Sequence, residues 1–338
     1  MRELKAACIG LVHDHCWGEM ERTRAVPGVR LVAAADRNAP QLRRVKAKYP
    51  EIRTYRDWKA LVRAERPDFA LVMLENATTH PVVEGLAKAG VHVMSEKPMA
   101  ARLHQADAMV RSARKHGIKL MINWPTAWNP ALHEARRLVK AGTIGRVYMA
   151  KTRGGHKGPR EIGCDRYFWE WLYDRRLNGA GALADYAGYG ANQFRFVLGE
   201  QPRSVSAIAR KLTKSYSVPD DNAVLTLEYA HALGVIETTW SQVAAPPFPY
   251  LAFYGTQGAL GVVGADIHVW REGRPVQVIH PKPLPAHLRS GPAYMAWAIR
   301  NHMPIEGPTS PAISRQAQEV IEAAIRSNAS GRRIRLPL

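Results

Sequence analysis

The sequence predicts an α/β protein in two parts: a parallel, doubly wound sheet comes first, and an α+β region with a large, mostly antiparallel sheet follows. Three observations predict this division. The chain has 338 residues, more than one ordinary hydrophobic core accommodates. Short aliphatic runs alternate with amphipathic segments up to about residue 122. After Asn123, runs of alternating polarity replace them.

The first part consists of strands joined by helices. Five aliphatic runs are rich in residues suited to strands that are buried on both faces; they cover 4–12, 29–36, 69–76, 91–96 and 118–123. Helix-like segments separate them, at about 16–25, 39–48, 57–65, 79–89 and 102–116. This alternation requires right-handed crossovers, which produce a parallel sheet. We therefore predict a Rossmann-like, dinucleotide-binding domain over residues 1–123.

The second part, residues 124–338, begins with a predicted helix at about 129–141 and ends with another at about 311–328. Runs of alternating polarity between them are typical of an antiparallel sheet with one covered face; they cover 146–154, 204–211, 222–230, 232–240, 250–256 and 267–272. The boundary at 122–128 contains no low-complexity linker, so we expect a tight hinge there. We leave open whether the final helix and tail, 311–338, pack back on the first domain.

Composition narrows the classes of function. The net charge of +19 raises nucleic acid, acidic lipid or an anionic small molecule as partners, but the basic residues are scattered instead of forming the clustered stripe that phosphate contacts require. No apolar stretch is long enough to cross a bilayer. The three cysteines show no paired spacing, which predicts neither a disulfide framework nor a cysteine zinc site. We expect a cytoplasmic protein that binds neither nucleic acid nor membrane.

The turn after the first strand is the candidate diphosphate site. A dinucleotide fingerprint needs three glycines, but only Gly10 fits, because Val12 and His15 occupy the other two positions. Asp36, at the end of the second strand, supports the assignment because its carboxylate could accept the ribose hydroxyls. The amides at the start of the following helix can bind a diphosphate without the second glycine.

The same turn allows a metal interpretation. His13 and His15 form a His-x-His pair of the kind that opens the metal-dependent hydrolase barrels. Such a barrel needs further histidine and aspartate ligands at later strand ends. The later strands offer Asp36, Glu75-Asn76 and Glu96-Lys97, which is a poor ligand set without further histidines. We therefore expect no metal, and histidines that merely line a loop remain an alternative.

The segment AGVHVMSEKPMA, 89–100, places Glu96 and Lys97 at the carboxyl end of a buried strand, where open parallel sheets bind ligands. Pro98 biases Lys97 away from helical geometry. This segment resembles the hallmark of the glucose-fructose oxidoreductase, inositol dehydrogenase and rhizopine-catabolism (Gfo/Idh/MocA) family. The resemblance extends along the chain through four further segments, at 68–80, 138–147, 171–192 and 254–260, and through the tail.

The resemblance implies a Rossmann domain and a C-terminal α/β domain that binds substrate and whose open sheet forms the subunit interface of a homodimer or homotetramer. It implies NAD(P)-dependent oxidoreduction of a sugar, polyol or sugar derivative. Asp36 favours NAD, whereas Arg37 could accommodate the additional phosphate of NADP. The residues expected to contact the cofactor are Gly10, Val12, His13, His15, Asp36, Arg37, Leu74, Asn76, His80, Glu96, Lys97, Asn123 and Trp171.

The family's catalytic segment carries an aspartate and, four residues later, usually a histidine; here these positions are Asp185 and Tyr189. The tyrosine resembles the glucose-fructose oxidoreductase and pyranose or dihydrodiol dehydrogenase branches. By the chemistry of alcohol oxidation, a cationic Lys97 would stabilise the alkoxide and favour the phenolate of Tyr189, which would exchange the proton. Asp185 would orient Lys97 or the substrate.

Three residues are candidates for substrate contact: Trp128, His156 and Asp165. The segment AWNP, 127–130, departs from the family, since many members carry an arginine there. Two alternative functions stay open. One is glycoside cleavage through a transient oxidation by tightly held NAD. The other is a non-catalytic sensor of sugar or cofactor, which the intact Lys97 and Asp185 argue against.

Overall fold

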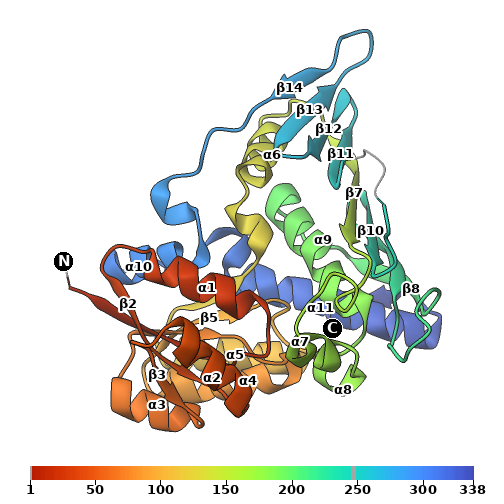
Figure 1. Cartoon of the computed structure of the whole chain (residues 1–338). Helices are drawn as coiled ribbons and strands as arrows, with labels where there is room; N and C mark the ends of the chain where they lie inside the picture. Colours follow the sequence, from red (N-terminus) through yellow and green to blue (C-terminus); the bar gives the residue numbers. More distant parts are fainter. Residues whose placement is uncertain (1, 245–248) are drawn as a thin grey trace.

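Two sheets organise the chain in the computed structural model, which describes residues 2–244 and 249–338 (Figure 1). The first sheet has six strands, all parallel, as predicted. Their spatial order is β3 (Arg53–Tyr55), β2 (Val29–Ala35), β1 (Leu4–Ile9), β4 (Phe69–Val72), β5 (His92–Glu96) and β6 (Leu120–Asn123). The Rossmann-like prediction is therefore confirmed.

The helices of this unit agree with the predicted segments to within three residues at each end. They are α1 (His15–Arg24), α2 (Ala39–Lys48), α3 (Trp58–Glu65), α4 (Asn76–Lys88) and α5 (Leu103–Lys115). β3 was not predicted, because a strand of three partly exposed residues has no hydrophobic run to reveal it.

The second sheet has nine strands, and its pairings are antiparallel except between the seventh and tenth strands. In spatial order they are β14 (Gln277–Ile279), β13 (Asp266–Trp270), β12 (Gly258–Val263), β11 (Leu251–Gly255), β7 (Val147–Gly155), β10 (Leu233–Thr239), β9 (Asn222–Glu228), β8 (Ser204–Arg210) and β15 (Ile334–Arg335). This confirms the large, mostly antiparallel sheet. β12, β14 and β15 were not predicted.

Helices cover one face of this sheet and fill the space between the two sheets. They are α6 (Pro130–Lys140), α7 (Arg166–Leu172), α8 (Arg175–Asn178), α9 (Ala182–Leu198), α10 (Gly291–Arg300) and α11 (Pro311–Ser330), with short 3₁₀ turns η1 (Pro125–Trp128), η2 (Ala286–Leu288) and η3 (Gly307–Thr309). α9 contacts β7, β9 and β10, whereas α11 lies against β8.

α9 is a central helix that the sequence did not predict, because glycine disfavours helices and this segment contains several. Tertiary packing overrides that preference. A Cβ atom at Gly188 would lie 2.6 Å from the ring of Trp124 and 3.1 Å from Ile321, so only glycine lets the helix approach them closely. The glycines that made a helix hard to predict therefore allow this helix to pack closely against its neighbours.

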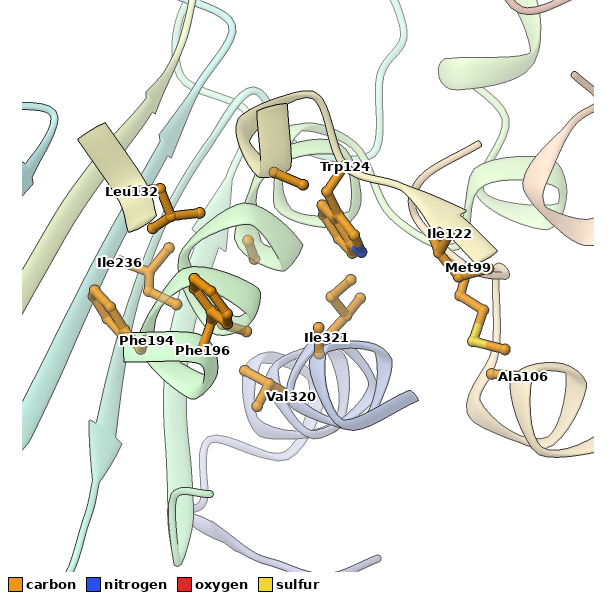
Figure 2. Packing of buried hydrophobic residues seen from close by; sticks show 14 of the residues in the cluster. Met99, Ala106, Ile122, Trp124, Leu132, Phe194, Phe196, Ile236, Val320 and Ile321 are labelled. Atoms are coloured by element: carbon orange, nitrogen blue, oxygen red, sulfur yellow. The ribbon is translucent and has the colours of Figure 1, made fainter. Parts of the chain in front are cut away.

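One hydrophobic core crosses the boundary between the two units (Figure 2). Figure 2 shows Trp124 above Ile321 of α11, with Ile122 of β6 on one side and Phe194 of α9 on the other. Trp124 is buried, and its indole N–H donates to the hydroxyl of Ser314 over 3.1 Å. The stretch 122–128, where we expect a tight hinge, is therefore part of the shared core.

The C-terminal third of the chain returns to the first sheet. α10 packs against α1 and β5 and contributes apolar residues to the core of the first unit. α11 contacts α5 and β6 as well as α9. Within the described residues, no helix has the length and apolar character needed to cross a membrane.

Candidate active site

A buried ion pair joins the two units. β5 ends immediately before Lys97, and the first turn of α9 carries Asp185. The Lys97 ammonium Nζ lies 2.8 Å from Asp185 Oδ1, and the two side chains are 5% and 8% exposed. The indole N–H of Trp240 donates to Asp185 Oδ2 over 3.1 Å. The structure thus brings together the two residues in which the sequence placed the chemistry.

Both members of this pair are charged at neutral pH. Burial by itself would lower the pKa of Lys97, but the Asp185 carboxylate, followed by Tyr189 and Tyr186, outweighs burial and raises this pKa. Burial would likewise raise the pKa of Asp185, but Lys97 overcomes it and the pKa falls. A buried ammonium held by a carboxylate is a preorganised donor for an oxygen that develops negative charge.

Two tyrosines of α9 lie beside Lys97. Its Nζ is 4.8 Å from the ring centre of Tyr189 and 5.9 Å from that of Tyr186, and the two rings stack on each other. Burial raises the pKa of Tyr189 to about 12, against the opposing effect of Lys97. Lys97 thus favours the phenolate, as expected, but burial outweighs the nearby cation, so Tyr189 is a neutral phenol at neutral pH.

His156 joins this group from the loop after β7. Its ring packs edge-on against Tyr186, with 5.5 Å between ring centres. The amide N–H of Gly158 donates to His156 Nδ1 over 2.9 Å, which assigns the ring proton to Nε2. Burial lowers the pKa of His156, so the ring is neutral and presents Nε2–H as a hydrogen-bond donor.

A polar cluster fills the turn between β1 and α1. His15 Nδ1 lies 3.1 Å from Glu96 Oε2, and His13 Nε2 lies 4.0 Å from the same oxygen. The Asn123 amide donates to Glu96 Oε1 over 2.7 Å, and the indole N–H of Trp128 donates to Asn123 Oδ1 over 2.9 Å. Trp128, a candidate for substrate contact, is thus linked to this cluster through Asn123.

The same cluster offers atoms to a metal, since the ligand atoms of His13, His15 and Glu96 all lie within 4.8 Å of one another. The sequence did not predict that Glu96 lies beside these two histidines. However, the amide N–H of His15 donates to His13 Nδ1 over 3.2 Å, so the ring proton of His13 is on Nε2, the atom that faces Glu96. A metal would need that lone pair, and we therefore interpret the cluster as a hydrogen-bonded one.

Glu96 makes stability depend on pH. Burial opposes its ionisation, but His15, His13 and Asn123 outweigh burial and lower its pKa to about 2. A carboxylate with a depressed pKa contributes stability above its ordinary value of 4.5, and this contribution is lost as the pH falls from there to about 2. We expect wild type to exceed Glu96→Gln in free energy of unfolding by about 3 kcal/mol at pH 7.

Urea unfolding at pH 7, 5 and 3.5 measures this difference, which should be constant down to pH 5 and smaller at pH 3.5. Glu51→Gln is the matched control, because the side chain of Glu51 is 53% exposed. A difference between wild type and Glu96→Gln that does not change with pH would contradict the assignment.

A cavity of about 190 Å³ lies at the carboxyl ends of β1, β2 and β4, and its lining includes the predicted cofactor contacts Gly10, Val12, Asp36, Arg37 and Leu74. Gly10 forms its floor with φ +86°, and a Cβ atom there would lie 2.6 Å from both Leu74 Cδ2 and the Met73 carbonyl oxygen. The Asp36 carboxylate accepts the amides of Leu11 and Asn38, each over 2.6 Å. The lining also includes seven residues that the sequence did not single out as cofactor contacts: Ile9, Ala35, Arg56, Trp58, Glu75, Thr78 and Val82.

Sequence reasoning missed these residues because they come from segments far apart in the chain that only the fold assembles. Trp240 and Tyr186 were missed for the same reason. A signal was available for Tyr186, which follows Asp185 directly, and for Trp240, which ends a predicted strand.

The remaining predicted contacts divide into two groups. Trp171 donates its indole N–H to the Val12 carbonyl over 3.3 Å, so α7 covers the first turn, and its contact with the cofactor stays a prediction. Asn76 instead donates to Asn178 Oδ1 over 2.8 Å, which ties α4 to α8. His80 lies further along α4 and does not line the cavity. The Asn76 amide is thus used between helices, and the cofactor contacts of Asn76 and His80 stay predictions.

Asp165 has a structural position. Its side chain accepts the Tyr167 amide over 3.0 Å and so caps α7, and it pairs with Arg44 over 2.5 Å. Both oxygens therefore have partners within the protein, and contact of Asp165 with substrate hydroxyls stays a prediction. Arg37 is paired with the buried Glu75.

Two family models match the chain and together cover most of it. The model of the oxidoreductase family with an NAD-binding Rossmann fold matches residues 8–124. The model of the GFO/IDH/MocA C-terminal domain matches residues 132–261. These two matches fall on the two sheets described above.

The relatives with assigned activities include sugar dehydrogenases. A D-apiose dehydrogenase from Paraburkholderia graminis is 30% identical over 156 residues, 45% of this chain and 40% of its own length. A D-xylose 1-dehydrogenase [NADP(+)] from Haloarcula marismortui is 28% identical over 230 residues, 67% of this chain and 61% of its own length. The chain therefore spans less than two thirds of the length of each of these relatives.

Solved structures share the whole fold. The aldose-aldose oxidoreductase from Caulobacter crescentus, crystallised with glycerol, superposes with a TM-score of 0.84. Its sequence is 24% identical, and the match covers 99% of this chain and 100% of that one.

Proposed function

Because the chain belongs to the Gfo/Idh/MocA family of NAD-binding oxidoreductases, we propose that it transfers a hydride between NAD and a secondary alcohol or carbonyl group of a sugar, polyol or sugar derivative. The observation that carries this proposal is the buried Lys97–Asp185 pair, 2.8 Å apart, at the carboxyl end of β5. The sugar class of substrate rests on the names of the relatives.

The residues of the first unit fit a dinucleotide. The cavity at Gly10 and Asp36 would hold the adenosine half, and the first amides of α1 would face the diphosphate. Trp171 and Lys97 would border the nicotinamide half. When bound, the cofactor supplies or accepts the hydride.

Lys97 would donate a hydrogen bond to the reacting oxygen and stabilise its negative charge. Asp185 keeps Lys97 protonated and fixes its direction, while Trp240 fixes Asp185. His156 would donate its Nε2–H to a second substrate oxygen. Oxidation of an alcohol to a carbonyl group and reduction of that carbonyl group both require such hydrogen-bond donors.

Tyr189 would exchange the proton. With a pKa near 12 it is protonated at neutral pH, so it is ready to donate a proton to a carbonyl substrate in the reducing direction. Oxidation of an alcohol needs the phenolate. Below pH 12, the phenolate fraction rises about tenfold for each pH unit.

This assignment predicts how activity varies with pH. We expect the rate of alcohol oxidation to rise steeply from pH 7 to 10, while the rate of carbonyl reduction changes little over the same range. Tyr189→Phe should lower both rates by about 10²-fold or more and remove the rise in the oxidation rate. The measurement is turnover of a sugar panel with NAD or NADH, followed by cofactor absorbance at each pH.

Tyr148→Phe is the matched control, since Tyr148 lies on β7 and is 47% exposed. An oxidation profile that Tyr189→Phe leaves unaltered would remove Tyr189 from this role. NADH formed in proportion to substrate consumed would separate net oxidation from glycoside cleavage without net redox change. Failure of the protein to bind either NADH or NADPH would overturn the proposed function itself.

We also propose that a second copy of the chain covers the outer face of the nine-stranded sheet. Ile208 and Val224 are paired across β8 and β9, and with Leu233 of β10 they are 65%, 48% and 52% exposed. Apolar side chains grouped on a sheet face favour association. Sedimentation velocity would show a dimer or tetramer, and a monomer at all concentrations would contradict this.

A further inference from the structure

We propose that Glu75 makes the protein select NAD over NADP by holding Arg37 away from the position of the additional phosphate. This inference rests on the proposed function, since it concerns the cofactor of the same site. It differs from a preference set by Asp36 alone, because it assigns the selection to a residue in the turn between β4 and α4.

Glu75 is placed between β4 and α4 with its carboxylate buried. The residue is 2% exposed and lines the adenosine cavity. Its Oε2 accepts the hydroxyl of Thr78 over 2.7 Å, and its Oε1 accepts the guanidinium of Arg37. Both carboxylate oxygens therefore have partners, and the partner of Oε1 is the Arg37 guanidinium, which could otherwise bind a phosphate.

Arg37 is the residue that would normally recognise NADP. It follows Asp36 at the end of β2, where an arginine can accommodate a phosphate on the ribose. The Arg37 side chain is 67% exposed, so solvent offers it room to move, but its charge is neutralised by Glu75. A phosphate entering here would meet two carboxylates, Asp36 and Glu75.

Recruiting Arg37 to a phosphate would break the pair. Glu75 would then be a buried carboxylate without a cation, which is strongly unfavourable. A ribose with free hydroxyls leaves the Arg37–Glu75 pair intact, because its hydroxyls need only hydrogen-bond acceptors, and Asp36 supplies one. The Arg37–Glu75 pair therefore favours NAD in two ways. The carboxylates repel the additional phosphate of NADP, and binding that phosphate would break the ion pair.

Arg56 is a second cation that lines the cavity, and the experiment has to separate it from Arg37. The full-length protein is titrated with NADH and with NADPH, and cofactor fluorescence gives both dissociation constants. Four proteins are compared: wild type, Glu75→Gln, Glu75→Gln with Arg37→Met, and Glu84→Gln. The last removes one negative charge from the same helix outside the cavity, and circular dichroism confirms that each variant is folded.

We expect wild type to bind NADH at least about tenfold more tightly than NADPH, the difference that one charge-assisted contact commonly makes. Glu75→Gln should reduce this ratio by about tenfold, mainly through tighter binding of NADPH. Adding Arg37→Met should restore the preference for NADH. Glu84→Gln should match wild type.

Two outcomes would overturn the inference while leaving the proposed function intact: equal binding of both nucleotides by wild type, or a gain in NADPH binding that survives Arg37→Met and so belongs to Arg56. If neither nucleotide binds to wild type, the proposed function fails and the inference with it. If Glu75→Gln does not fold, Arg37→Met alone decides the question. A loss of NADPH binding of more than about threefold in that variant would mean that Arg37 already serves the phosphate.

Discussion

Lys97→Met is expected to lower turnover by about 10³-fold or more, because the substrate oxygen loses the donor that stabilises its negative charge. Methionine keeps the length of the side chain and removes only the charge and its hydrogen bonds. Cofactor binding should weaken less than turnover, since the contribution of Lys97 is greatest when charge develops on the reacting oxygen. Steady-state rates and NADH titrations of the same preparation measure the two effects separately.

The same change should also destabilise the protein. Lys97→Met leaves the Asp185 carboxylate buried with Trp240 as its remaining donor, which commonly costs about 3–5 kcal/mol of unfolding free energy. Lys97→Met combined with Asp185→Asn removes the unpaired charge and should recover most of that stability without recovering turnover. Urea unfolding checks the first expectation. A double variant that regained activity would show that the ion pair serves packing and not chemistry.

Gly10→Ala is expected to abolish NADH binding at concentrations that saturate wild type and to destabilise the fold by about 2–4 kcal/mol. Two effects combine at this position. The backbone has φ +86°, a conformation that alanine rarely adopts, and the added Cβ would lie 2.6 Å from the Met73 carbonyl oxygen of the neighbouring strand. Relief of this contact has to move the turn that faces the diphosphate.

Gly90→Ala provides the matched control. Gly90 has φ +74°, and a Cβ atom there would meet nothing within 4 Å. This variant should therefore lose only the backbone contribution, about 1–2 kcal/mol, and bind NADH like wild type. If Gly10→Ala also binds NADH like wild type, the turn after β1 is not where the diphosphate lies.

The helices and strands that sequence reasoning located share a physical property: the local spacing of their apolar residues indicates which faces are buried. β2 and β4 are nearly continuous apolar runs because both faces of a parallel sheet are covered. α5 and α6 show a clear apolar face. α9 was missed because its stability comes from what it packs against, and a glycine-rich segment carries no local sign of that.

The sequence alone determined the two-part α/β architecture, and it predicted the cofactor turn at Gly10 and Asp36 and a reacting centre at Lys97 and Asp185. The tertiary structure decided which side chains interact with one another. It paired Lys97 with a carboxylate 88 positions away, kept Tyr189 protonated through burial, and used Asp165 and Asn76 to join helices. It also placed Arg37 against Glu75. Partnerships and pKa shifts of this kind depend on distances across the folded chain, which no local pattern of residue types records.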